Sequence, residues 1–404
     1  MVFSAMERFV DTNHPWLKEI HPDSLIRTLV EAIRIPSPTG LEREMGEYCA
    51  ERMRRAGLEV TEATLRPESP NFVGRLTGDR PGLSLCYHAH TDTVPPGDPG
   101  TWTKDPFAGV VENGRVFGRG ACDVKQDIAV MLAVAEILAE HREHLSGSLI
   151  LCFASGEEIA DPAGTQHVID SGQLDGVDFA VVGEQTECRV GVAHRGGLHL
   201  GVTVKGESAH SSIADRAGVN AIYKMSRVIE TIRTRYLPDL AGRSHHPYLP
   251  APTANVAIIQ GGVKPNMVPD RCEMVMGRRT LPHETPEQVR EEVEAILADL
   301  RREDPELDVE VEITKVMAPF ETDPGNPHVR SLLRAASAVL GDPQEPMGYV
   351  AGTDARLFPP AGIPAVVFGP GEFSQAHTAD ESVSIDQVVQ ATRILALLAA
   401  DLLE

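Results

Sequence analysis

Apolar residues recur at helical spacing in residues 23–35 and 41–57, and the segment "IPSPTG" between them holds prolines and a glycine that break a helix. Four apolar runs of strand length follow: "NFVGRLTG", "LSLCYHAH", "SLILCFAS" and "FAVVGE". The helical pattern "DIAVMLAVAEILAEH" separates the second run from the third. Strand-length runs that alternate with a helix of this kind predict an α/β domain whose mainly parallel sheet is covered on both faces.

The pattern changes from about Arg195 onward. The predicted elements there are a strand, a helix, two strands, a helix and a strand, running from "LHLGVTVKG" to "LDVEVEITK". This is the split βαβ order of a small ferredoxin-like α+β domain. "HVRSLLRAASAVLG", "PAVVFGPG" and a closing helix from Ile385 then resume the first pattern. We therefore predict a discontinuous α/β domain made of residues 1–192 and 316–404, with a second domain inserted at residues 193–315.

Length and charge limit the class of protein. A chain of 404 residues exceeds what one hydrophobic core usually serves, which agrees with two domains. The formal net charge is −22, and the acidic residues are spread along the chain without a compensating basic cluster. Because a nucleic-acid partner would require a positive surface, nucleic-acid binding is not expected.

The apolar runs and the cysteines indicate where the protein works. The longest apolar run, Ile128 to Ala139, is too short to span a bilayer, and the first 20 residues lack the apolar core of a secretory signal. The six cysteines are scattered without a C-x-x-C pair, which favours reduced thiols. These features predict a cytoplasmic protein that does not associate with membranes.

Polar groups gather where the predicted strands end, as in "CYHAHTD", "FASGEE" and "VVGEQT". Ligands of parallel sheets bind at the carboxyl ends of strands, so these side chains are candidates for one site. A site for two zinc ions needs about three nitrogen or oxygen donors per ion, with one donor shared. "GRGACDVK" and "QAHTADE" add donors, and the candidate set is His90, Asp123, Glu157, Glu158, Glu184 and His377.

Neighbouring residues in this set cannot all have the same role. Glu157 and Glu158 leave the backbone in different directions, so we expect one to bind metal and the other to face the substrate as general base. Asp92 lies two residues after His90 on the same strand edge and can accept the second imidazole N–H of that histidine. His88 shares the period-2 phase of His90, so phase alone does not decide which histidine is a ligand.

Two other catalytic classes lack their motifs. No G-x-S-x-G elbow is present, which disfavours a serine hydrolase. "GRGACD" is not followed by the lysine and hydroxyl residue of a phosphate-binding loop, so a nucleotide site is not expected there.

The ordered motifs resemble those of the M20 family of dinuclear zinc peptidases and amidohydrolases, in particular the acetylornithine deacetylases and succinyl-diaminopimelate desuccinylases. They are "HTDTVPPGD", "GRGACDVK", "SGEE", "VVGEQT", "GESAHSS", "PNMVPD", "RTLP", "GTDAR" and "FGPGEFSQAHTADESV". The similarity covers nearly the whole chain, and the inserted domain is similar to the lid and dimerisation domain of that family. The resemblance implies two Zn²⁺ ions per chain, with Co²⁺ or Mn²⁺ as alternatives, and a homodimer formed through the lid domain.

The resemblance also implies a role for each candidate ligand. Asp123 corresponds to the carboxylate that bridges the two ions; Glu158 and His377 complete one site, and His90 and Glu184 complete the other. Glu157 corresponds to the general base, and Asp92 to the residue that orients His90. His88 corresponds to a position without a metal role.

In the lid, His210 resembles the histidine that relatives extend across a dimer interface to stabilise the oxyanion in the partner's site. Asn266 and Arg279 resemble residues that hold the substrate, and a guanidinium suits a carboxylate because it binds it with two hydrogen bonds. Arg195 and Arg356 are further candidates for that task, with a structural salt bridge as the alternative for each. We expect Arg278 to be a solvated neighbour of Arg279.

Three positions depart from the family pattern. Gln126 stands where many members have glycine, Gln185 where proline is common, and Gly277 where an aspartate often precedes the arginine of "R-x-x-P". We expect none of the three to contact a predicted ligand, so they bear on substrate identity rather than on the chemistry.

The predicted activity is metal-dependent hydrolysis of the amide bond of an N-acyl amino acid. A carboxypeptidase or dipeptidase with the same centre is the first alternative, and its substrate would be a short peptide. A non-catalytic relative that binds carboxylated ligands is an alternative of another class, which the presence of Glu157 disfavours.

Overall fold

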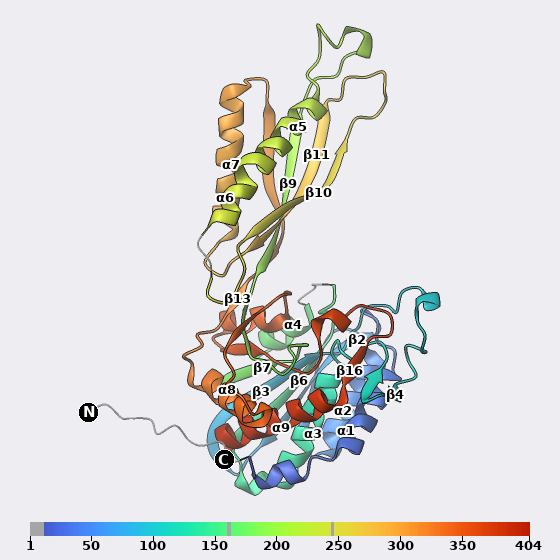
Figure 1. Cartoon of the computed structure of the whole chain (residues 1–404), viewed down its shortest axis with the longest axis vertical. Coiled ribbons are helices and arrows are strands. Elements are labelled where there is room, and N and C mark those ends of the chain that lie inside the picture. Colours follow the sequence, from blue (N-terminus) through green and yellow to red (C-terminus); the bar gives the residue numbers. More distant parts are fainter. Residues whose placement is uncertain (1–11, 160–162, 244–245) are drawn as a thin grey trace, which may run out of the picture. The chain divides into compact units, whose positions relative to one another are not determined.

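The computed structural model describes residues 12–159, 163–243 and 246–404 (Figure 1). The chain divides into two compact units. Unit 1 comprises Met1–Val192, Thr322–Tyr349 and Thr353–Glu404, and unit 2 comprises Ala193–Glu321 and Val350–Gly352. Each unit has its own sheet and its own helices, so each is described separately.

A nine-stranded sheet forms the centre of unit 1. Its order is β1-β2-β6-β3-β7-β15-β8-β13, with β14 also paired to β8. The central pairs β6–β3, β3–β7 and β7–β15 are parallel. The bounds are β1 (Glu59–Arg66), β2 (Ser69–Thr77), β3 (Arg80–His90), β6 (Ser146–Ala154), β7 (Phe179–Val182), β8 (Gly191–His194), β13 (Phe320–Glu321), β14 (Met347–Tyr349) and β15 (Ala365–Val367).

The helices of unit 1 pack through buried apolar residues. In α1, Leu25, Leu29, Ala32 and Ile33 are buried at the spacing of one helix face. Consecutive residues of β3 and β6 are buried, which requires cover on both sheet faces. The helices are α1 (Pro22–Ile33), α2 (Arg43–Arg55), α3 (Lys125–Glu140), α4 (Ala163–Asp170), α8 (Pro327–Leu340) and α9 (Ile385–Leu403). The helices predicted at residues 23–35 and 41–57 are thereby confirmed.

Unit 2 contains a four-stranded antiparallel sheet of order β10-β11-β9-β12. The elements are β9 (Gly196–Lys205), α5 (Ala221–Thr231), α6 (Leu237–Gly242), β10 (Thr253–Gly261), β11 (Arg271–Thr280), α7 (Pro286–Glu303) and β12 (Asp308–Met317). Strand, helix, two strands, helix and strand follow one another as predicted. Thr285 and Gln288 form a capping box at the start of α7, and its buried face packs into the core of this unit. The predicted fold class is therefore confirmed.

Two features of the fold were not predicted. The chain that continues from α5 changes to π-helical geometry at Ile232–Tyr236, just before Pro238, which has no N–H for the helical ladder. Unit 1 also contains a small sheet of order β16-β5-β4, formed by β4 (Val110–Glu112), β5 (Arg115–Phe117) and β16 (Ser382–Ser384). This small sheet brings the chain that follows His377 beside the chain that precedes Asp123.

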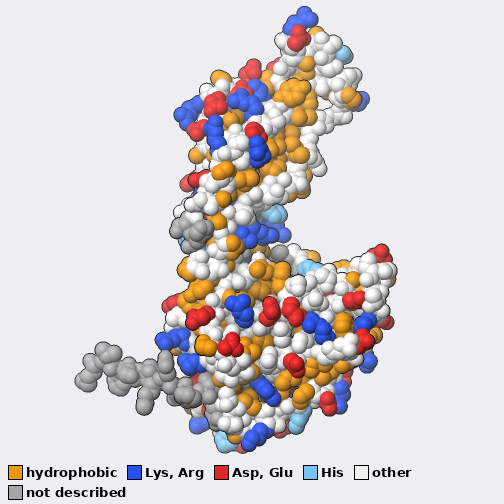
Figure 2. Space-filling model, viewed as in Figure 1, with side chains coloured by type: hydrophobic (Ala, Val, Ile, Leu, Met, Phe, Trp, Pro, Cys, Tyr) orange, Lys and Arg blue, Asp and Glu red, His pale blue; other side chains and the backbone are white. Residues whose placement is uncertain are grey.

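The surface, the thiols and the helices add three observations. Basic and acidic side chains are interspersed over the face drawn in Figure 2. All six cysteines are buried and none forms a disulfide. None of the helices in the described ranges is both long enough and apolar enough to cross a membrane.

Candidate metal centre

The first group of candidate ligands is buried in unit 1. His90 ends β3, Glu184 lies two residues after β7, and Asp123 lies two residues before α3. One ligand atom from each lies within 4.8 Å of the others, and all three residues are buried. The Nε2 atom of His90 is 3.2 Å from Oδ1 of Asp123. We refer to His90, Asp123 and Glu184 as the buried group.

The second group shares Asp123 and adds Glu158 and His377, again with ligand atoms within 4.8 Å of one another. The Nε2 atom of His377 is 2.9 Å from Oε2 of Glu158 and 3.4 Å from Oδ2 of Asp123. The His377 side chain is 54% exposed, in contrast to the two carboxylates. We refer to Asp123, Glu158 and His377 as the exposed group; the two oxygens of Asp123 thus face different groups.

Parallel pairing brings these loops together. His90 of β3 pairs with Ala154 of β6, so the loop that carries Glu157 and Glu158 starts beside the end of β3. Gly156 has a φ of 83°, a backbone conformation that glycine adopts without strain. This turn directs the N–H groups of residues 156–158 toward the end of β3.

The Asp92 carboxylate fastens that loop. It accepts hydrogen bonds from the backbone N–H groups of Gly156, Glu157 and Glu158, each at 3.1 Å. The Nδ1 atom of His90 lies 3.0 Å from the backbone oxygen of Asp92 and 3.5 Å from its carboxylate. The Asp92 carboxylate therefore lies closer to the backbone N–H groups of residues 156–158 than to the His90 ring. These residues include the predicted base Glu157 and the candidate ligand Glu158.

A buried ion pair supports the segment that contains Asp123. Arg119 and Glu381 form a salt bridge, and both side chains are almost completely buried. Glu381 also accepts hydrogen bonds from the backbone N–H groups of Cys122 at 2.7 Å and Asp123 at 3.0 Å. The sequence interpretation missed this residue, although it lies in "HTADE", four residues after His377.

The donor set fits divalent cations. Burial raises the pKa of Glu184 well above its usual value, and the charges of Asp123 and Glu157 raise it further. Hydrogen bonds to Asp123 and Glu158 raise the pKa of His377 to about 10. Without ions, protons thus compensate the crowded carboxylates, and a bound cation would displace them. Nitrogen and oxygen ligands of this kind suit Zn²⁺, Co²⁺ or Mn²⁺.

Glu157, the predicted base, is partly buried beside the ligands. Burial raises the pKa of its carboxyl well above the usual value; the charge of His90 opposes this shift, whereas Asp354 and Glu158 add to it. A carboxylate with a raised pKa is a better proton acceptor near neutral pH, which suits general-base catalysis.

His88 and Arg356 belong to a separate buried network. The Nε2 atom of His88 is 2.8 Å from the Thr165 hydroxyl, which donates to Oδ2 of Asp354 at 2.6 Å. Arg356 lies 3.4 Å from Oδ1 of the same aspartate. Burial lowers the pKa of His88 to about 4, with Asp354 acting in the opposite direction. Neither His88 nor Arg356 belongs to either candidate metal group.

The remaining predicted residues lie in unit 2. Burial and the charge of Arg279 lower the pKa of Arg195, so the two guanidinium groups lie close enough to interact. His210 is exposed, and its Nδ1 atom is 2.8 Å from the Ser212 hydroxyl. Asn266 is exposed and accepts a backbone hydrogen bond from Ser211 at 3.1 Å.

The expectation that Arg278 is solvated is wrong. Only 1% of this residue is exposed, and it forms an ion pair with Glu284 and donates to the Tyr236 hydroxyl at 3.2 Å. Successive residues of β11 point to opposite sheet faces, so Arg278 is buried while its neighbour Arg279 is exposed.

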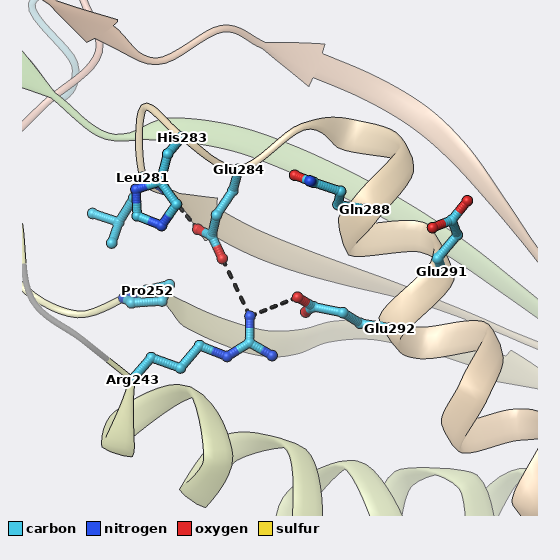
Figure 3. A pocket seen from close by; sticks show the side chains of 8 residues that line it. All are labelled: Arg243, Pro252, Leu281, His283, Glu284, Gln288, Glu291 and Glu292. Carbon is cyan, nitrogen blue, oxygen red and sulfur yellow. Dashed lines mark hydrogen bonds and ion pairs between the residues drawn. The ribbon is translucent and has the colours of Figure 1, made fainter.

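A pocket of about 670 Å³ lies beside this ion pair in unit 2 (Figure 3). Arg243 bridges Glu284 at 3.3 Å and Glu292 at 2.6 Å within it. Its lining residues are Arg243, Pro252, Leu281, His283, Glu284, Gln288, Glu291 and Glu292. None of them is a candidate metal ligand, and the acidic side chains that contact Arg243 are already paired, so this pocket is distinct from the candidate centre.

One of the three departures from the family pattern does contact a predicted ligand, contrary to expectation. The amide Nε2 of Gln185 donates to Oδ2 of Asp123 at 3.0 Å. Gln126 donates to the backbone oxygen of Cys122 at 2.6 Å. The Gln185 contact was missed because it depends on two loops that meet only in the folded chain.

Comparison with known proteins assigns the family. The profile of "Peptidase family M20/M25/M40" matches residues 86–401, which is most of the chain. The chain therefore belongs to this family, and the predicted membership in a family of metal-dependent amidohydrolases and peptidases is confirmed.

The sequence relatives include deacylating enzymes. The chain is 28% identical over 406 residues to N-formyl-4-amino-5-aminomethyl-2-methylpyrimidine deformylase of Bacillus subtilis (strain 168), covering 93% of this chain and 94% of the relative. It is 29% identical over 356 residues to acetylornithine deacetylase of Myxococcus xanthus, covering 87% of this chain and 90% of the relative. The second of these relatives agrees with the predicted branch of the family.

A solved structure agrees with the fold. The Bacillus subtilis YXEP protein, described as a dinuclear metal-binding peptidase from the M20 family, superimposes with a TM-score of 0.73. The match has 18% sequence identity and covers 95% of this chain and 98% of that chain. At this identity the comparison supports the architecture alone.

Proposed function

We propose that this chain is a dinuclear metal hydrolase that cleaves the amide bond of an N-acyl amino acid. The observation that carries the proposal is the shared carboxylate: the two oxygens of Asp123 face different ligand groups. We assign Zn²⁺ to both groups, with Co²⁺ or Mn²⁺ as alternatives, because all the donors are imidazole nitrogens or carboxylate oxygens. When bound, such ions polarise a carbonyl and lower the pKa of water toward about 7.

The residues of the chain supply the proton transfer. Glu157 takes the proton of the attacking water and gives it to the amine nitrogen as the amide bond breaks. Its position next to the ligand Glu158 and its raised pKa support this role. A protein that only binds carboxylated ligands would not need an unligated base here, which disfavours that alternative.

Substrate binding is assigned to unit 2. Arg279 and Arg195 bind the free carboxylate of the substrate; the closeness of the two cations favours an anion. Asn266 binds the substrate, and His210 donates to the oxyanion from the second copy of a homodimer. The ion pair with Asp354 supports a structural role for Arg356 rather than substrate binding.

The exposed apolar side chains of unit 2 support the homodimer. Tyr223 on α5, Ile258 and Ile259 on β10, and Val263 are all at least half exposed. Large exposed apolar side chains that gather in a patch mark interaction surfaces, and these four are candidates for one. Mixing an inactive His210→Ala chain with an inactive Glu157→Ala chain tests the arrangement: partial recovery is expected, and no recovery in proven mixed dimers would count against it. The six unpaired thiols support a reducing compartment such as the cytoplasm.

The Glu157→Gln variant tests the mechanism. It should retain two ions per chain and lose about 100- to 10,000-fold in kcat, the usual contribution of general-base catalysis. Metal content is measured by inductively coupled plasma mass spectrometry, and Glu47→Gln, on an exposed helix position, is the matched control. Retained turnover would show that another group is the base.

A substrate screen tests the reaction class. Metal-loaded protein is assayed against acetylated, succinylated and formylated amino acids and against dipeptides. Faster hydrolysis of the acylated amino acids is expected, and a preference for dipeptides would favour the peptidase alternative.

A further inference from the structure

Gln185 makes a direct contact with the shared carboxylate of the metal centre. It follows the ligand Glu184 and is 3% exposed. Its Nε2 atom donates to Oδ2 of Asp123 at 3.0 Å.

The loop that carries Gln185 is held against the segment at residues 369–371. Thr186 and Cys188 donate their backbone N–H groups to the oxygen of Gly369 at 3.2 and 2.9 Å. A Cβ atom on Gly371 would lie 3.4 Å from the Cβ of Gln185 and 2.5 Å from Sγ of Cys122, so the close approach requires glycine there. The Gln185 side chain is thus fixed by its backbone as well as by its hydrogen bond.

The orientation of the amide follows from its partner. A carboxylate only accepts hydrogen bonds, so the N–H side of the amide must face Asp123. Within residues 12–159, 163–243 and 246–404, the Oε1 atom of Gln185 has no hydrogen-bond partner. Among the described residues, the Gln185 side chain is therefore hydrogen-bonded through its Nε2 atom to Asp123 and not through its Oε1 atom.

We propose that Gln185 is a positioning residue that holds Oδ2 of Asp123 toward the exposed group and raises the affinity of that group for its ion. The inference rests on the proposed metal centre. A carboxylate oxygen has two acceptor directions; the amide occupies one and leaves the other for the ion. His90, at the end of a strand, contacts Oδ1 of Asp123, which faces the buried group. Oδ2 of Asp123 faces the exposed group, and this oxygen accepts a hydrogen bond from the Gln185 amide. Loss of the amide therefore acts mainly on the exposed group.

The test is ion binding by the full-length chain, independent of hydrolysis. Ion-free wild type and Gln185→Leu are titrated with Co²⁺ and followed by calorimetry and by visible absorption. We expect two binding steps in the wild type, and we assign the weaker step to the exposed group. In the variant, the affinity of that weaker step should fall by about 10- to 100-fold, the usual effect of a lost hydrogen bond to a metal ligand. The tighter step should change by less than about threefold.

Two further variants keep the test decisive. Gln185→Met has nearly the same length but no hydrogen-bond donor, and it replaces Gln185→Leu if the latter does not fold; it should weaken the same step. Gln126→Leu is the matched control, because Gln126 is equally buried but donates to the backbone oxygens of Cys122 and Pro370 and to the Asp127 carboxylate rather than to Asp123. It should lower the Tm without changing the ratio of the two affinities.

The outcomes separate this inference from the proposed function. A wild-type chain that binds fewer than two ions overturns the dinuclear centre itself. Two ions in the wild type with both steps unchanged in the Gln185 variants overturn the role of Gln185 and leave the centre in place. Equal weakening of both steps in the Gln185 and Gln126 variants also overturns it, because the effect would then be general destabilisation.

Discussion

The two ligand groups use the same kinds of donor but differ in how firmly the protein holds them. In the buried group, His90 ends a strand and contacts the backbone oxygen of Asp92, and Glu184 contacts the Tyr349 hydroxyl at 3.3 Å. In the exposed group, His377 lies on a loop with a φ of 61°, a conformation that non-glycine residues rarely adopt. The difference teaches that identical ligand chemistry does not imply identical sites. We expect the buried group to retain its ion more strongly.

Substitution of Asp123, which both groups share, should abolish ion binding at the buried and the exposed group alike. Asp123→Asn removes the only carboxylate common to both, so we expect fewer than one ion per chain and a loss of at least about 1,000-fold in kcat/KM, because several kcal/mol of charge stabilisation is lost. Metal analysis and hydrolysis assays measure both effects, with Asp342→Asn on the surface as control. Two retained ions would contradict the bridging role.

Removal of one histidine from each group should make the difference visible. His90→Ala should lose the tightly held ion, whereas His377→Ala should lose only the weaker one, and each should lower kcat/KM by about 10- to 1,000-fold. Because the His377 side chain is 54% exposed and His90 is buried, added imidazole should restore activity only to His377→Ala. Equal rescue of the two variants would mean that the groups are equally accessible.

The smallest effect is expected from Tyr349. Tyr349→Phe removes the hydroxyl that donates to Glu184 and should weaken ion binding at the buried group by about two- to fivefold, the value of a modest hydrogen bond. The exposed group should be unaffected, which makes this variant the counterpart of Gln185→Leu. Titration with Co²⁺ measures both affinities, and Tyr248→Phe in unit 2 is the control. Weakening of the exposed group alone would contradict the assignment.

The fold was largely predictable because its signals are local. Apolar runs, helix periodicity and breakers identified the main strands and helices, and ligand candidates followed from polar residues at the strand ends. The hairpin formed by β4 and β5 was missed although Asn113 and Gly114 both have positive φ, the signature of its turn. Its pairing with β16 joins residues far apart in sequence, which no local pattern specifies.

The site was less predictable where it depends on contacts between loops. Sequence position suggested Asp92 as a partner of His90, but the fold directs its carboxylate mainly to the backbone of residues 156–158. Gln185 and Arg278 were misjudged because the direction of a side chain, and what another segment places opposite it, arise only on folding. Glu381 was within a quoted motif, yet its bonds to backbone N–H groups have no sequence signal.

The six buried cysteines make the opening of the molecule measurable. A thiol reagent reaches a buried sulfur only while the surrounding structure is transiently open, so the labelling rate reports local unfolding. Five of the thiols, Cys49, Cys86, Cys122, Cys152 and Cys188, lie in unit 1, and Cys272 lies in unit 2, so the two units carry separate natural probes. Cys122 directly precedes Asp123, so the labelling rate of its thiol can report how strongly bound ions suppress local unfolding around the metal centre.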